Sequence, residues 1–290
     1  MKILIPTLLA GFLLLSLGCG GGNSSVSTSG PLSGNWQVSL VQNYPAPQTQ
    51  LSVSGFLTQS SNSLAGNVQG PTITAASGNT TCGGVGPLSG TITGQNVSFS
   101  VSPGGTVFNF TGTISSDNTS MSGTYQSQGG ACSNYPSSGT WTAALIPPLN
   151  GSFTGTISDS QYMAALTGSS SPVNVTGTLS QTPNVGSNSA SVSGTITAQG
   201  YPCFVTASVT GTISGSSVLL SVYSYNGDLI GSIGSKSTPA VAAPTSGGIS
   251  LTTGQDGLQL GTAGSGPCPA IQVNGSNMST DAAEVALTFQ

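Results

Sequence analysis

The sequence has very little charge and lacks two residue types entirely. Its 290 residues contain no histidine and no arginine, and charged residues make up 3% of the chain. The absence of histidine excludes histidine-based catalytic triads, and no Gly-x-Ser-x-Gly elbow is present. Nucleic-acid binding requires several cations to neutralise phosphates, so that class is excluded too. We therefore expect no enzyme and no cofactor.

The few ionisable side chains have structural interpretations. Lys236 is a solvated lysine in a Pro/Ala/Ser loop. Turn phrases contain Asp117, Asp228 and Asp256, where aspartate caps backbone amides. Asp281 and Glu284 have the spacing of a capping box, which predicts one helical turn over 281–286. Because histidine is absent, we expect stability to be nearly constant between about pH 5 and 8.

An export signal is predicted at the N-terminus. The apolar run 3–17 follows a single lysine and has about 15 residues, whereas a permanent membrane span needs about 20. The following Ser16-Leu17-Gly18-Cys19 resembles the lipobox of bacterial lipoproteins. The resemblance implies a signal peptide over 1–18 and diacylation of Cys19, with palmitate-type chains anchoring the protein to a membrane. An ordinary secretory signal ending near a cysteine is the alternative.

Residues 19–31 then form a Gly/Ser-rich tether. The resemblance to lipoproteins implies a location in the cell envelope, as an outer-membrane lipoprotein facing the periplasm or the cell surface. The oligomeric state is open.

Four cysteines remain when Cys19 is set aside. Outside the cytoplasm, Cys82, Cys132, Cys203 and Cys268 should form disulfides. The sequence repeat described next favours Cys82–Cys132 and Cys203–Cys268 among the three pairings. No metal site is expected, because neither CxxC spacing nor histidine is present.

A short phrase, Gly-Thr-Ile-Thr/Ser or a close variant, recurs along the chain, for example at Gly90, Gly112, Gly194 and Gly211. Around each copy, apolar residues alternate with hydroxyl residues, and this period of two predicts β-strands. Glycine lies on the apolar face of each phrase, where it permits a sharp bend. Strands separated by short turns are typical of an antiparallel meander.

The pattern occurs twice, with Ile146-Pro147-Pro148 at the boundary. We predict an all-β chain of two tandem up-and-down, barrel-like domains over 32–146 and 149–290, each with one disulfide. Closed barrels are favoured because a charge-poor chain has few residues to protect exposed sheet edges.

Gly34-Asn35-Trp36 on the first predicted strand resembles the Gly-x-Trp opening of lipocalin and avidin-like (calycin) barrels. The resemblance implies a barrel whose tryptophan closes one end and whose cavity holds a small apolar ligand. The residues that would line such a cavity are Trp36, Phe99, Phe108, Phe110, Tyr125 and Trp141.

Three functional hypotheses follow. The first is a non-catalytic, lipid-anchored envelope protein whose neutral surface contacts glycans or other proteins. The second is a calycin-like carrier of a small apolar ligand. The third, which the sequence favours least, is a transmembrane β-barrel, because alternating strands end near Phe289.

Overall fold

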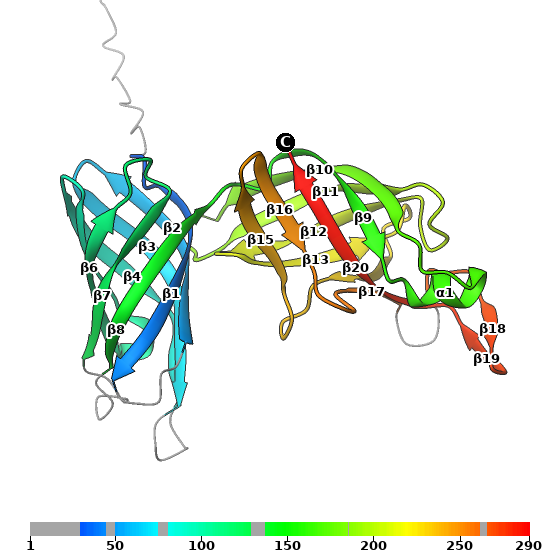
Figure 1. Ribbon diagram of the computed structural model, residues 1–290, viewed down its shortest axis with the longest axis horizontal. Helices are drawn as coiled ribbons and strands as arrows, with labels where there is room; N and C mark the ends of the chain where they lie inside the picture. Colours follow the sequence, from blue (N-terminus) through cyan, green and yellow to red (C-terminus); the bar gives the residue numbers. More distant parts are fainter. Residues whose placement is uncertain (1–29, 45–49, 75–80, 129–136, 185, 262–265) are drawn as a thin grey trace, which may run out of the picture.

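The computed structural model describes residues 30–44, 50–74, 81–128, 137–184, 186–261 and 266–290. These residues form two antiparallel β-barrels that lie side by side (Figure 1). The prediction of an all-β chain with two tandem barrels is therefore confirmed.

Barrel 1 is a closed ring of eight strands in sequence order, with β1 hydrogen-bonded to β8. Each strand pairs with the next one along the chain, so barrel 1 is an uninterrupted up-and-down meander. Its elements are β1 (Gly34–Tyr44), β2 (Gln50–Ser60), β3 (Ser63–Thr74), β4 (Thr81–Thr93), β5 (Asn96–Val101), the 3-10 turn η1 (Pro103–Gly105), β6 (Val107–Ile114), β7 (Ser120–Gln128) and β8 (Ser138–Ile146).

Barrel 2 is closed by pairing of β12 with β13 and has one divided wall. Between β13 and β20, the wall consists of β15 and β16 at one end and of β14 and β17 at the other. Its elements are β9 (Gly151–Ser158), α1 (Gln161–Thr167), β10 (Val173–Pro183), β11 (Ala190–Ala198), β12 (Thr206–Ser214), β13 (Ser217–Tyr223), β14 (Leu229–Ile233), β15 (Ala240–Thr245), β16 (Gly248–Thr252), β17 (Leu258–Leu260), β18 (Ile271–Val273), β19 (Ser276–Met278) and β20 (Asp281–Phe289).

The predicted helical turn at 281–286 is wrong. These residues belong to strand β20, in which Asp281, Ala283, Val285, Leu287 and Phe289 all point inward and are buried. The same segment has both the capping-box spacing and an alternation of apolar residues. Burial of the alternate residues favours the strand over the helix. The helix that does form, α1, is capped instead by Ser160 and Gly168.

The recurring glycines make room for aromatic rings inside the barrels. In barrel 1, Gly112 lies opposite Gly123, which lies opposite Trp141. The Trp141 indole extends across this glycine pair, and its Nε1 donates to the carbonyl oxygens of Thr111 (3.2 Å) and Thr124 (3.1 Å). A Cβ on Gly112 would lie 2.8 Å from Cζ2 of Trp141. The glycine repeat is thus a packing device in the sheet as well as a bend.

Candidate ligand-binding groove

A groove of about 870 Å³ lies between the two barrels. One wall is the outer surface of β2, β3 and β4, the other is the turn between β10 and β11, and the segment after β8 joins them. The lining residues are Ser33, Gly34, Asn35, Phe56, Leu57, Thr58, Ala65, Gly66, Asn67, Pro87, Leu88, Leu145, Ile146, Pro147, Pro148, Gln181, Pro183, Asn184, Gly186 and Ser187.

Phe56 is the one aromatic residue among those that line the groove. It projects outward from barrel 1 and packs against the hydrophobic core of barrel 2 while remaining partly exposed. Pro87 and Ala65, on the neighbouring strands, are exposed in the same wall. Together with the prolines of the linker, they give the groove a rigid, mainly apolar surface.

Hydrogen bonds between the barrels fix the groove's shape. Asn35 is buried, and its side chain accepts from the Gly215 amide (2.7 Å) and donates to the Gly215 carbonyl (2.8 Å). Gln37 Oε1 accepts from the Ser216 amide at 3.1 Å. At the rim of the groove, Asn67 Nδ2 donates to the Gly186 carbonyl oxygen at 3.0 Å. The β12–β13 turn of barrel 2 is therefore attached to β1.

The polar groups of the groove are uncharged. None of the lining residues is ionisable, and the polar side chains are amides and hydroxyls. Gln181 Oε1 accepts from the Leu149 amide at 3.0 Å, so this side chain also holds the linker in place. A concave, mostly apolar site at a domain interface with a few fixed polar groups is typical of small-molecule binding. The lack of charge favours an uncharged ligand.

The six predicted cavity residues all lie inside barrel 1, where they are buried. Five of the rings, all but that of Trp36, form one contacting cluster: Phe99 stacks on Phe110 with centroids 4.6 Å apart, and Trp141 packs edge-on against both. Trp36 donates from Nε1 to the Leu32 carbonyl oxygen at 2.9 Å. The predicted lining residues are thus brought together in the interior of barrel 1.

Burial raises the pKa of the Tyr125 phenol, which faces the same interior. The Ser137 side chain partly offsets this rise in pKa, and within the described ranges the Tyr125 hydroxyl has no partner at hydrogen-bonding geometry. The group remains protonated at neutral pH.

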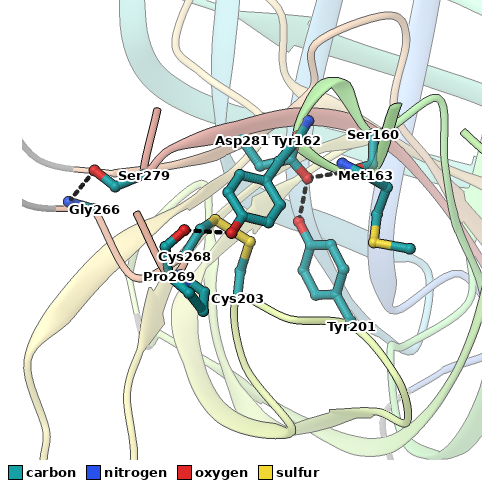
Figure 2. Close-up of a disulfide and its surroundings, with 10 residues drawn as sticks. All are labelled: Ser160, Tyr162, Met163, Tyr201, Cys203, Gly266, Cys268, Pro269, Ser279 and Asp281. Atoms are coloured by element: carbon teal, nitrogen blue, oxygen red, sulfur yellow. Dashed lines mark hydrogen bonds between the residues drawn. A yellow bond between two sulfur atoms is a disulfide. The ribbon is translucent and has the colours of Figure 1, made fainter. Parts of the chain in front are cut away.

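The predicted Cys203–Cys268 disulfide is present and joins residues 65 apart (Figure 2). Cys132, the side chain of Cys82 and the lipidation residue Cys19 lie outside the described residues, and so does the second predicted disulfide.

A buried carboxylate lies near this disulfide (Figure 2). Asp281 is 4% exposed and accepts hydrogen bonds from the Ser160 hydroxyl (2.7 Å), the Tyr162 amide (2.9 Å) and the Tyr201 hydroxyl (2.5 Å). Burial, and then the hydrogen bond to Asp281, raises the pKa of Tyr201 well above its usual value. Because protein donors occupy both carboxylate oxygens, Asp281 stabilises the fold by connecting β20 with α1 and with the segment after β11.

Sequence reasoning missed the groove, although one signal for it exists. In the recurring phrase, the residue after glycine is an outward-facing threonine, as in Gly90-Thr91 and Gly112-Thr113. Gly55-Phe56 places a phenylalanine at that outward position. An aromatic residue on the hydroxyl face predicts a contact outside the barrel.

Within the described ranges, no group of three or more Cys, Asp or Glu residues is arranged to hold a metal ion. No helix in this part of the chain is long and apolar enough to cross a membrane. Comparisons with protein-family models, curated proteins and solved structures found no significant match. Function is therefore inferred from the chain's own residues.

Proposed function

We propose that this chain is a non-catalytic, lipid-anchored envelope protein that carries a small, uncharged, mainly apolar ligand in the groove between its barrels. The groove itself is the observation that supports this proposal: about 870 Å³, within the range of 300–1,000 Å³ that is typical of ligand pockets. The carrier hypothesis from the calycin resemblance is retained, with the ligand placed between the barrels instead of inside one.

The groove is suited to apolar ligands in both shape and chemistry. Phe56 and the prolines of the walls offer apolar area, and they lose little conformational entropy when a ligand binds because their own freedom is already small. The amides of Asn67 and Gln181 at the edges can orient a single polar group. An ionised ligand would lose its hydration without gaining an opposite charge, which is unfavourable.

The anchor is proposed from the sequence. Acylation of Cys19, followed by the tether over 19–31, would hold the groove close to a membrane. Lipid bilayers concentrate uncharged apolar molecules, so a carrier anchored there would meet its ligand at high local concentration.

Nile red, an uncharged dye whose fluorescence rises in apolar surroundings, tests the groove. We expect saturable binding of one dye per mature chain. Ala65 is exposed within the groove, so Ala65→Trp should fill the site and weaken binding at least tenfold. The matched control is Ala165→Trp, at an exposed position on α1, which should bind like the wild type. Equal binding by both variants would contradict the proposal.

Metabolic labelling with an alkyne analogue of palmitate tests the anchor. We expect label on the wild-type chain and none on Cys19→Ser. Label that persists on Cys19→Ser, or an unlabelled wild-type chain, would show that the lipoprotein assignment is wrong. Neither result bears on the groove, which dye binding tests separately.

A further inference from the structure

A second hollow, of about 540 Å³, lies on barrel 2 away from the groove. The β12–β13 turn contacts barrel 1, and β13 runs from that turn to the opposite end of barrel 2, where this hollow is found. We call it the Tyr225 hollow. Its lining residues are Cys203, Phe204, Val205, Thr206, Ser224, Tyr225, Asn226, Asp228, Ile230 and Pro267.

Two exposed apolar side chains line this hollow, and a third belongs to a residue next to a lining residue in the sequence. Tyr225 is 95% exposed, Val205 is 57% exposed and Leu229, beside the lining residue Asp228, is 50% exposed. The floor contains Phe204 and Ile230, which are buried. Single exposed apolar residues are ordinary, but several around one hollow indicate a binding surface.

The Tyr225 ring is presented by an ordered turn. The Ser224 amide donates to the Asp228 carbonyl oxygen (2.8 Å), and the Gly227 amide donates to the Ser224 carbonyl oxygen (2.9 Å). On the other side of the hollow, the Cys203–Cys268 disulfide fixes the chain before Phe204. These bonds order the backbone that carries Tyr225, and the ring itself is almost fully exposed to solvent.

Polar groups beside the ring are available to a ligand. Within the described ranges, the Asn226 amide and the Asp228 carboxylate make no side-chain hydrogen bond, so the expected capping of backbone amides by Asp228 is not found; the Asp228 backbone amide donates to Ser224 Oγ at 3.2 Å. The hollow therefore offers an aromatic face, a donor–acceptor amide and a strong acceptor within one small area.

We propose that the Tyr225 hollow binds a neutral saccharide. A pyranose has an apolar C–H face, which would stack on the Tyr225 ring, and hydroxyls around its edge, which would donate to Asp228 and exchange hydrogen bonds with Asn226. A purely apolar ligand would desolvate the carboxylate without a partner. An anionic ligand would meet Asp228 with no cation among the lining residues. This site goes beyond the proposed carrier function and is independent of it.

Saturation-transfer-difference NMR with maltose, cellobiose, lactose and N,N'-diacetylchitobiose, and with glucuronate as the anionic control, tests the site on the mature chain. We expect saturable binding of at least one neutral disaccharide through its C–H protons and none of glucuronate. Tyr225→Ala should weaken binding at least fivefold, Tyr225→Phe should retain it, and Asp228→Asn should weaken it. The matched control Leu166→Ala removes an exposed apolar side chain from α1 and should bind normally.

Three results would overturn the assignment. These are the absence of binding by all four disaccharides, binding that is unchanged in Tyr225→Ala, and self-association in sedimentation that depends on Tyr225, which would assign the surface to a second copy of the chain. Retention of sugar binding by Ala65→Trp would show that the two sites are separate.

Discussion

The two barrels share one sequence repeat and differ in what surrounds it. Barrel 1 is a simple meander whose interior contains a cluster of aromatic rings in mutual contact. The interior of barrel 2 is mainly aliphatic, its wall is divided, and one end carries α1, the β18–β19 hairpin, a disulfide and a buried carboxylate. The repeat is thus common to the two barrels, whereas much of the polar network around Asp281 and of the Tyr225 hollow comes from segments between the strands.

The largest expected difference between the barrels concerns the disulfide of barrel 2. Cys203 and Cys268 are separated by 65 residues, and a crosslink of that length stabilises a fold by about 4 kcal/mol in the chain-entropy model. Replacing both cysteines by serine should lower the unfolding free energy of barrel 2 by up to that amount. Both tryptophans, Trp36 and Trp141, lie in barrel 1, so their fluorescence reports barrel 1 alone and should be unchanged. A fluorescence midpoint that falls with the far-UV CD midpoint would mean that the barrels unfold together.

The next effect in size comes from the buried carboxylate. Asp281→Ala leaves the donors on Ser160, Tyr162 and Tyr201 without their partner, at a cost of about 3 kcal/mol in all. We expect this loss in barrel 2, measured by urea denaturation followed by far-UV CD. Glu284→Ala on the same strand is the control and should change stability by less than about 0.5 kcal/mol. Equal losses in the two variants would contradict the structural role of Asp281.

Interior glycines should behave alike in both barrels. A Cβ on Gly112 would clash with the Ser122 carbonyl oxygen and the Trp141 ring, and a Cβ on Gly177 would clash with the Thr195 carbonyl oxygen and the Phe153 ring. Each Gly→Ala change should therefore destabilise its own barrel by about 2 kcal/mol. Gly254→Ala, where a Cβ meets nothing within 4 Å, is the control. Thermal melts of the three variants would show whether both barrels require glycine at these close approaches; a neutral Gly112→Ala would restrict the requirement to barrel 2.

The smallest effect is expected from pH. Hydrogen bonds from the Ser115 hydroxyl, and then from the Thr119 amide, lower the pKa of Asp117 from 3.8 to about 2. A carboxylate with a lowered pKa stabilises the fold above pH 3.8, and this contribution is lost as pH falls from 3.8 toward 2. The melting temperature should therefore be nearly constant between pH 5 and 8 and decline only in acid, with a weaker decline in Asp117→Asn. A shift of many degrees between pH 5 and 8 would contradict this account.

Much of the fold could be predicted because its signals are local. Alternation of apolar and hydroxyl residues predicts the strands. Because few charged residues are available to protect exposed sheet edges, the composition favours closed barrels. The parallel placement of cysteines in the two halves predicts Cys203–Cys268, which the structure contains.

Helix α1 and the first part of the strand at 281–289 were not predicted because their local sequence signals are weak or conflicting. Ser160 and Gly168 are good caps for α1, but seven residues give too little periodicity to stand out. At Asp281, a capping-box spacing and a strand alternation coincide, and burial of Val285, Leu287 and Phe289 decides between them.

The groove could not be predicted because it arises from the relative placement of two barrels. That placement depends on contacts between residues about 180 positions apart, such as Asn35 with Gly215. The sequence shows only the outward Phe56, without its partner. A residue that lines the interface, such as Phe56, can thus be recognised in the sequence as an exception to the alternation of apolar and hydroxyl residues. Which residues it faces across the interface is known only from the tertiary structure.

The central claim is that the ligand lies between the barrels and not inside one of them. Photolabelling of the mature chain with an uncharged diazirine-bearing fatty alcohol, followed by peptide mapping, tests it most directly. We predict label on the segments around Phe56, Pro87, Pro147 and Pro183, and its loss in Ala65→Trp. Label concentrated on Phe99, Phe110 and Trp141 would place the ligand inside barrel 1 and contradict the account.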